Sequence, residues 1–198
     1  MTRLIFASSL LILVAAVMLA PAARAQDAAV WRLGLVQHNI HIGGYGDMQS
    51  HEGGANVEAE LVGKPIRGLS AIWSPRAYVM GSANTQGDTS FAAAGLYWEW
   101  RPWRGWSVEP GFGLAVHDGE LHNPYAAGDP RAAAFQLDHQ LLGTRLLFRD
   151  TLALDRDIGH GRAIGVVFEH LSNGGNLFGH HDNESLNELG VRFSSEFR

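Results

Sequence analysis

The chain has 198 residues, 15 Lys and Arg against 20 Asp and Glu, and a formal net charge of -5. The basic residues are scattered and form no basic run, which argues against nucleic acid as a partner. The chain contains no cysteine, so a disulfide framework, a cysteine-ligated metal and a thiol nucleophile are all excluded.

The N-terminus has the pattern of a cleaved secretory signal. Arg3 precedes an apolar run over residues 4–20, and Ala23-Arg24-Ala25 forms a small-x-small cleavage site. We expect cleavage after Ala25, which makes 1–25 the signal peptide and 26–198 a single exported domain; a membrane-anchored start is the alternative. Because no later apolar segment is long enough to cross a bilayer as a helix, the mature chain can enter a membrane only as a closed barrel.

From Val30 onward, segments of about ten residues alternate with turn-rich stretches, as in transmembrane β-barrels. Eight strands are predicted, at 31–38, 55–62, 71–81, 90–100, 106–117, 140–154, 161–172 and 186–197. The short connections 63–70, 101–105 and 155–160 are predicted periplasmic turns. The connections 39–54, 82–89, 118–138 and 173–185 are predicted outer loops, with a short helix at 132–134. The predicted fold class is all-β, an eight-stranded antiparallel transmembrane β-barrel; a soluble eight-stranded barrel or sandwich is the alternative.

Alternation along the strands separates a bulky apolar face from a face that is small or charged. The charged side chains that fall on the second face are predicted to form a structural network in the lumen. This predicted network consists of Arg145, Arg149, Glu169, Glu188 and Arg192.

The seventh predicted strand ends with a base and a hydroxyl on one face. His170 and Ser172 are two positions apart, so their side chains point the same way from a β-strand. Ile164, Val166 and Phe168 precede them on that face, which therefore looks toward lipid, and the strand runs toward the outer leaflet. Glu184 follows the serine by twelve positions. A hydroxyl, a base and an orienting acid are the three parts of an activated serine nucleophile.

The segment 170–197 resembles the lipid A 3-O-deacylases of the PagL type, eight-stranded outer-membrane barrels that remove a 3-hydroxyacyl chain from lipid A. The resemblance rests on the sequence His170-x-Ser172-Asn173 at the top of strand seven and on the spacing to Glu184. It implies that Ser172 is the nucleophile, His170 the general base and Glu184 the orienting acid. It also implies that Asn173 belongs to the oxyanion hole.

The loop after Asn173 departs from the Asn-x-Gly of that family. The second oxyanion donor is therefore open between the Gly174 backbone N–H, Asn176 and Asn183. The resemblance implies no metal and no cofactor. The implied partner is lipid A, or lipopolysaccharide, in the outer leaflet of the bacterial outer membrane. A homodimer with a second copy of the chain is an open alternative that the sequence alone does not decide.

Other interpretations of the same residues compete with this one. Glu188 is an alternative acid, although its strand position predicts that it points into the lumen. The rival function is a non-catalytic small outer-membrane barrel that braces the membrane or binds a surface partner. A metal site is a further alternative, but the histidine spacing matches no standard zinc site. The histidines concerned are His38, His41 and His51, or His180 with His181.

Overall fold

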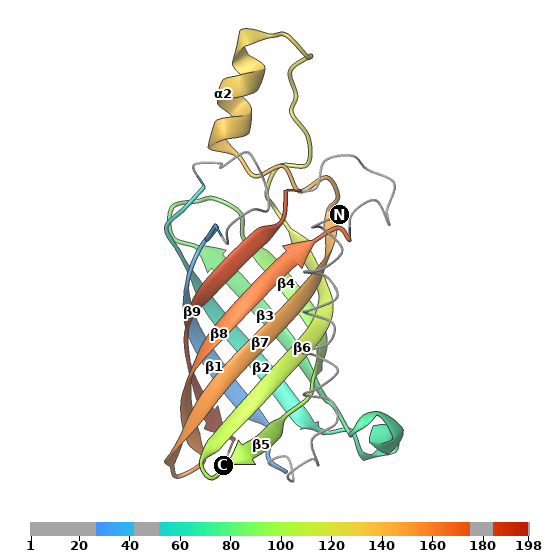
Figure 1. Ribbon diagram of the computed structural model, residues 1–198, viewed down its shortest axis with the longest axis vertical. Helices are drawn as coiled ribbons and strands as arrows, with labels where there is room; N and C mark the ends of the chain where they lie inside the picture. The colour runs from blue at the N-terminus through green and yellow to red at the C-terminus, as the bar shows by residue number, and fades with distance from the viewer. Residues whose placement is uncertain (1–26, 42–51, 175–183, 198) are drawn as a thin grey trace, which may run out of the picture.

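The computed structural model describes residues 27–41, 52–174 and 184–197. The predicted signal peptide and its cleavage site lie outside these residues. The described elements, drawn in Figure 1, are β1 (Val30–Gln37), β2 (Ala55–Pro65), η1 (Arg67–Ile72), β3 (Arg76–Asn84), β4 (Phe91–Tyr97), β5 (Trp100–Trp103), β6 (Trp106–His117), α2 (Pro130–Asp138), β7 (Leu146–Gly159), β8 (Arg162–Ser172) and β9 (Leu186–Glu196).

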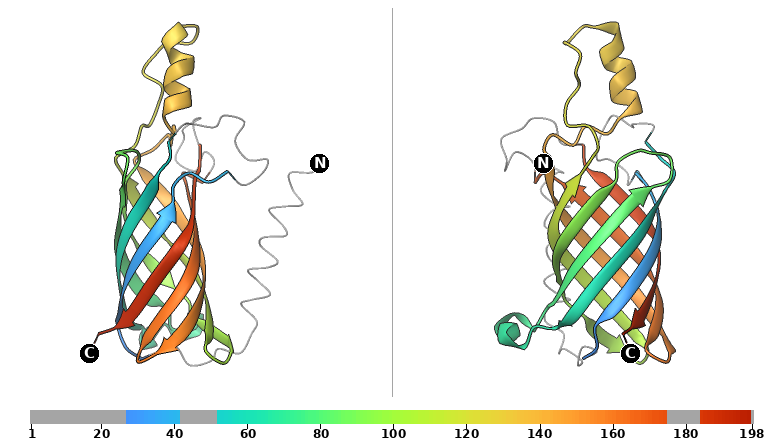
Figure 2. Two further views of the ribbon diagram at one scale, coloured as in Figure 1. Left: turned by 90° about the vertical axis from the view of Figure 1, so that its left-hand side faces the viewer. Right: turned by 180° about the vertical axis from the view of Figure 1, so that it is seen from behind.

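The strands close into an antiparallel barrel (Figure 2), which has eight strands when β4 and β5 are counted as one. Strands that follow one another in the chain pair with each other, except β4 and β5. Instead, β4 pairs with β6, and β1 pairs with β9 to close the sheet. The short β5 pairs with β6 and continues β4 after a break at Trp98 and Glu99. The predicted eight-stranded antiparallel barrel is therefore confirmed.

Two predicted strands begin later than expected. The strand predicted at 71–81 starts only at Arg76, because 67–72 form the 3-10 helix η1 and the positive φ angles of Trp73 and Ser74 break the extended path. The strand predicted at 140–154 starts at Leu146. Residues preceding it belong to the loop instead, since the N–H of Leu142 donates to the carbonyl of Glu120 at 3.0 Å.

The helix predicted at 132–134 is longer than expected and covers Pro130–Asp138. The carboxylate of Asp129 accepts the backbone N–H of Arg131 at 2.9 Å, and Pro130 stands in the first turn. An Asp cap satisfies a free N–H at the start of a helix, and a proline there loses no helical hydrogen bond. These two residues explain where α2 begins.

The polarity of the barrel is reversed relative to a water-soluble domain. Large apolar side chains cover its outside, whereas charged side chains are buried inside it. The exposed apolar residues on the strands include Leu33, Leu35, Val57, Leu61, Val79, Phe112, Leu114, Val116, Leu152, Leu154, Ile164, Val166, Leu189 and Val191. An outward apolar band around a polar interior is the pattern of a membrane barrel, so the soluble alternative is wrong. None of the described helices is long and apolar enough to cross a membrane.

Ion pairs fill the lumen. Arg192 binds Asp155 at 2.6 Å and Glu109 at 2.8 Å, and Arg32 binds Glu109 at 2.7 Å. Nearer the other end, Arg149 makes a two-bond contact with Glu169 at 2.6 and 2.8 Å. The lumenal positions predicted for Arg149, Glu169, Glu188 and Arg192 are thus confirmed.

The prediction for Arg145 is wrong. This residue precedes β7 and lies in the loop, where its guanidinium donates to the carbonyls of His117 and Gly119 at 2.9 and 2.8 Å. Because the strand starts at Leu146, strand alternation does not apply to Arg145.

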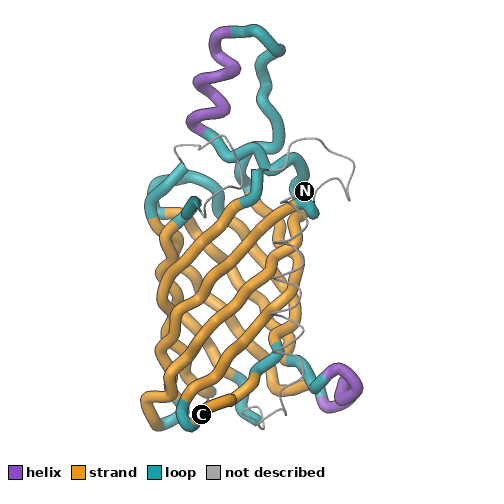
Figure 3. Tube along the Cα trace, viewed as in Figure 1, coloured by secondary structure: helices purple, strands orange, loops and turns teal. Residues whose placement is uncertain are grey.

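The two ends of the barrel differ. At one end the start of β1 meets the end of β9, and the N–H of Phe197 donates to the carbonyl of Ala29 at 2.9 Å. At the other end lie the long connections, and α2 stands beyond the strands (Figures 1 and 3). An even number of strands places both chain ends on the periplasmic side, so the α2 end is the outer one. β8 rises toward it and ends there at Ser172.

Candidate active site

A row of three polar side chains crosses the outward face of the barrel near its outer end. The strand registers pair Asp150 of β7 with His170 of β8, and His170 with Asn187 of β9. The next outward pair above this row is Phe148 with Ser172. Polar groups on a lipid-facing wall are costly at the bilayer midplane, and less so near the interface. Their position at the outer end of the barrel therefore fits the interface between lipid and water.

His170 is held by Asn187. The Nδ1 atom of His170 lies 2.7 Å from the amide oxygen of Asn187. An amide oxygen can only accept, so this contact requires the proton of the neutral imidazole to be on Nδ1. The Nε2 atom then carries the free lone pair, and it has no hydrogen-bond partner among the described residues. This is the tautomer that a general base needs.

Ser172 lies half-buried at the end of β8, on the same outward face as His170. Its hydroxyl makes no hydrogen bond with any residue in the described parts of the chain. His170 and Ser172 are two positions apart on the strand, so their Cα atoms are separated by roughly 7 Å. Catalytic hydrogen bonds are often long in a free enzyme and tighten only when substrate is bound.

An aromatic surface lies beside Ser172. The ring of Phe148, its partner on β7, stacks on that of Phe112 of β6 with centroids 5.8 Å apart. Phe112 is 47% exposed on the outward face. The two rings therefore form an apolar aromatic surface next to the serine.

Glu184 contacts a different part of the site. Its carboxylate accepts the backbone N–H of Leu141 at 2.8 Å and the side-chain amide of Gln136 at 3.0 Å. Its own N–H donates to the carbonyl of Leu141 at 3.0 Å. Glu184 therefore fastens the loop that follows α2 to the start of β9, and in this arrangement Asn187 rather than Glu184 bonds to His170.

Asn173 and Gly174 follow the serine directly. Asn173 is buried, and its side-chain amide donates to the carbonyl of Leu142 at 3.4 Å. Gly174 has a φ of 73°, a left-handed conformation in which glycine is favoured. The other two candidate donors, Asn176 and Asn183, lie outside the described residues.

The histidines proposed as metal ligands do not gather in the described part of the chain. His51, His180 and His181 lie outside it, and His38 is bonded to two carboxylates. The one group of three metal-binding side chains found among the described residues is Glu58, Glu169 and Glu188 in the lumen. Two of these carboxylates are already bonded, Glu169 to Arg149 and Glu188 to His38.

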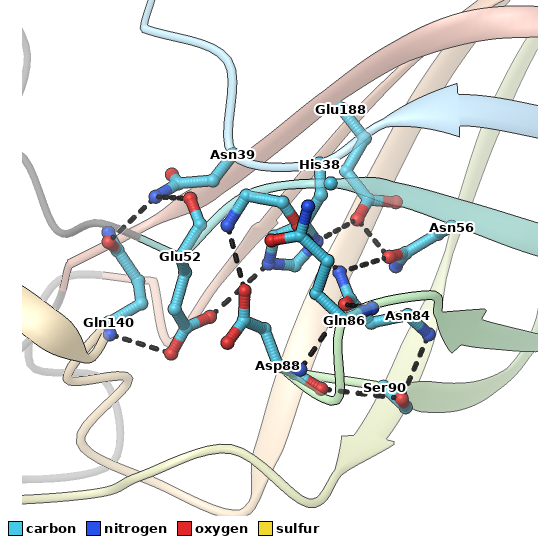
Figure 4. Close-up of polar contacts among 12 residues, drawn as sticks. His38, Asn39, Glu52, Asn56, Asn84, Gln86, Asp88, Ser90, Gln140 and Glu188 are labelled. Atoms are coloured by element: carbon cyan, nitrogen blue, oxygen red, sulfur yellow. Dashed lines mark hydrogen bonds and ion pairs between the residues drawn. The ribbon is translucent and has the colours of Figure 1, made fainter.

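A hydrogen-bonded network closes the lumen below the outer loops (Figure 4). The ring of His38 lies between two buried carboxylates, with Nδ1 2.8 Å from Glu188 and Nε2 3.2 Å from Glu52. Glu52 also accepts the N–H of Gln140 at 2.8 Å, which ties the α2 loop to the loop after β1. Glu188 further accepts the amide of Asn56 at 2.8 Å. The expected lumenal position of Glu188 is confirmed.

This network predicts that His38 stabilises the barrel in a pH-dependent way. Burial lowers the pKa of His38, but its hydrogen bonds to Glu188 and Glu52 outweigh burial and raise the pKa to about 9. Because the folded-state pKa exceeds the ordinary 6.5, the stabilisation is fully present below about pH 6.5 and is lost as pH rises through 9. Its upper bound is about 3 kcal/mol.

Thermal unfolding of detergent-folded barrel, with and without His38→Gln, checks this expectation. The difference in Tm between the two proteins should be largest near pH 6 and should shrink between pH 7 and 10. A difference that stays constant over this range would show that folding does not raise the pKa of His38.

Sequence reasoning missed Asn187 and Asp150 as neighbours of His170. A signal was present, because each is a polar residue on an otherwise apolar strand face: Asp150 lies between Phe148 and Leu152, and Asn187 precedes Leu189. Their positions beside His170, however, follow from the strand registers, which depend on loops of unknown path.

The fold and its surface define a class: the chain is a small outer-membrane β-barrel whose outer wall carries a histidine and serine pair. A family model described as "Lipid A 3-O-deacylase (PagL)" matches residues 47–196, and the chain belongs to this family.

Solved structures agree with the fold. The crystal structure of the outer membrane enzyme PagL is 15% identical, covers 86% of this chain and 100% of its own, and superposes with a TM-score of 0.55. Neisserial surface protein A is 9% identical over 88% of this chain and 100% of its own, with a TM-score of 0.50. No curated protein sequence matches the chain.

Proposed function

We propose that the chain is a serine esterase that hydrolyses the 3-O-linked acyl chain of lipid A. The observation that carries the proposal is the His170 and Ser172 pair on the lipid-facing wall, at the outer-leaflet end of β8, in a member of the lipid A 3-O-deacylase family. Because this face of the barrel looks toward lipid, the pair is positioned for an ester in the membrane rather than for an ester dissolved in water. The ester bonds of lipid A lie just below the head groups of the outer leaflet, and we propose that the pair at the outer end of β8 meets them there.

In the proposed reaction, Nε2 of His170 takes the proton of Ser172 while the serine oxygen attacks the ester carbonyl carbon. The bond from that carbon to the 3-oxygen of the sugar breaks, and His170 returns the proton to this oxygen. Water, deprotonated by His170, then attacks the carbonyl carbon of the acyl-serine. The bond from that carbon to the Ser172 oxygen breaks, and His170 returns the proton to this oxygen, which regenerates the serine. The products are a 3-hydroxy fatty acid and lipid A with a free 3-hydroxyl. Atoms and charge balance without any co-reactant other than water.

Glu184 is proposed as the acid that stabilises the imidazolium formed in each step. Glu184 stands three residues before Asn187, which pairs with His170 in the register of β8 and β9. To reach Nδ1 of His170, its carboxylate must leave the N–H of Leu141 and the amide of Gln136, and it must take the place of the Asn187 amide oxygen that contacts Nδ1 in the resting state. This exchange would couple the loop after α2 to catalysis.

The oxyanion would be bound by donors that follow the nucleophile. The backbone N–H groups of Asn173 and Gly174 are proposed for this role, together with the amide of Asn173 if it leaves the carbonyl of Leu142. One such donor typically contributes about 3 to 4 kcal/mol to transition-state stabilisation. All of these groups come from one copy of the chain, so the chemistry does not require a homodimer. We also propose that the active form is the exported domain 26–198.

Mass spectrometry of lipid A tests the proposed function. Cells whose lipid A carries the 3-O-linked chain should lose one 3-hydroxyacyl mass when they express the chain, and the free 3-hydroxy fatty acid should appear. Heat-modifiable migration on gels verifies in the same samples that the barrel is folded. Unchanged lipid A in the presence of folded barrel would instead favour a non-catalytic barrel.

A further inference from the structure

We infer that Asn187 is a positioning residue of this site, which selects the tautomer of His170 before the reaction begins. The inference rests on the proposed function and adds to it a residue outside the triad. It stands on the 2.7 Å contact between Nδ1 of His170 and the amide oxygen of Asn187, and on the strand register that places the two residues opposite each other.

The position of Asn187 is fixed by its neighbours. Leu186 and Glu188 on either side are both fully buried, and Glu188 is bonded to His38 and Asn56 inside the lumen. Alternation along β9 then directs Asn187 outward. The backbone of Asn187 is therefore held on both sides, so its amide is presented to His170 without a further change of the loops.

A hydrogen-bond partner offsets the cost of placing an amide next to lipid. An unbonded amide in an apolar environment loses its hydrogen bonds to water. Leucine or valine would suit this wall better, as at Leu189 and Val191 on the same face. The bond to His170 is the contact that accounts for an asparagine at the outer end of β9.

The chemistry of an amide suits the resting state of the base. A neutral acceptor at Nδ1 keeps the proton there and leaves Nε2 free, without holding His170 in its charged form. The other neighbour in the row is Asp150 of β7, a carboxylate, which faces His170 from the opposite side. Asp150 makes no hydrogen bond with any described residue, so the geometry gives the tautomer selection to Asn187.

Asn187→Leu tests the inference, because leucine is apolar and branched at the same carbon as asparagine, and apolar side chains already cover the lipid-facing wall. Nitrogen-15 NMR of the folded barrel at pH 8 reads the tautomer directly, and the His170 signals are identified by their loss in His170→Gln. We expect protonation on Nδ1 in the wild type and a mixture with the Nε2 tautomer in Asn187→Leu. An unchanged tautomer in this variant would overturn the inference, whatever the activity of the enzyme.

Kinetics on lipid A supply the second readout. Asn187→Leu should lower kcat by at least about 10-fold with little change in KM, less than the roughly 10⁴-fold seen when a triad loses its acid. Asn187→Asp, which keeps the acceptor oxygen, should recover much of the rate with a pH profile shifted upward, because a carboxylate beside Nδ1 favours the protonated imidazole. Asp150→Asn tests the other neighbour of His170 in the row. Ser195→Ala, on the outward face at the periplasmic end of β9, is the control that should stay near wild type. Full activity in Asn187→Leu, or a loss of activity in Asp150→Asn alone, would show that Asn187 does not position His170.

The proposed function and this inference fail separately. If Ser172→Ala remained active, the nucleophile would be wrong, yet the NMR experiment would still report on Asn187. If Ser172→Ala were inactive and Asn187→Leu behaved as wild type in rate, pH profile and tautomer, only the inference on Asn187 would be lost.

Discussion

Ser172→Ala is expected to abolish deacylation of lipid A, with a fall in kcat of at least about 10³-fold. Without the hydroxyl no acyl-serine can form, and His170 is left only to activate water at a position meant for the serine oxygen. The residue is half-buried at the last position of β8 and makes no hydrogen bond with the described residues, so its loss should not unfold the barrel. The measurement is the rate of 3-hydroxy fatty acid release from purified lipopolysaccharide in detergent.

Ser195→Ala is the matched control for this experiment. Ser195 lies on the same outward face of the barrel wall, on β9, but at the periplasmic end, where it pairs with Arg162 and Trp31. Its loss should leave the rate unchanged. A Ser172→Ala variant with wild-type rate would show that another group attacks the ester.

The barrel could be predicted from sequence because its signal is repeated. Each strand independently shows an apolar face and a small or charged face, so errors in single segments, such as the late start of β7 at Leu146, do not change the strand count. The late start of β7 also explains why the lumenal position predicted for Arg145 is wrong. Strand alternation does not apply to this residue, which lies in the loop after α2.

The histidine and serine pair could also be predicted, because two residues of one strand share a face by geometry alone. The residue that bonds to Nδ1 of His170 could not be predicted. Whether Glu184, Asp150 or Asn187 reaches Nδ1 depends on registers between strands and on the path of the last outer loop. The carboxylate of Glu184 stands at the expected spacing, but in the structure it accepts a hydrogen bond from the N–H of Leu141. Spacing along the chain therefore identifies the side chains that could bond to His170. Which of them does so depends on the other hydrogen bonds that each side chain can make.

Arg149→Met is expected to destabilise the barrel by about 3 to 5 kcal/mol, the cost of removing one partner of a buried ion pair. Arg149 is 2% exposed, binds both oxygens of Glu169 and donates to the hydroxyl of Tyr97 at 3.0 Å. Glu169 also lies within 4.8 Å of two other buried carboxylates, Glu58 and Glu188. The variant would leave this group of acids without its arginine, and urea unfolding of the barrel in lipid vesicles, followed by tryptophan fluorescence, measures the loss.

The double variant Arg149→Met with Glu169→Gln separates charge from packing. It removes both members of the pair, so it should recover much of the stability lost in the single variant, because no unpaired charge remains at that position. If the single and double variants unfolded at the same urea concentration, the cost would come from lost packing of the arginine against Tyr78, whose ring centroid lies 5.0 Å from the guanidinium. In either case the effect should appear in stability before it appears in the rate, since Arg149 points into the lumen while Ser172 and His170 face the lipid, and the wall of the barrel lies between them.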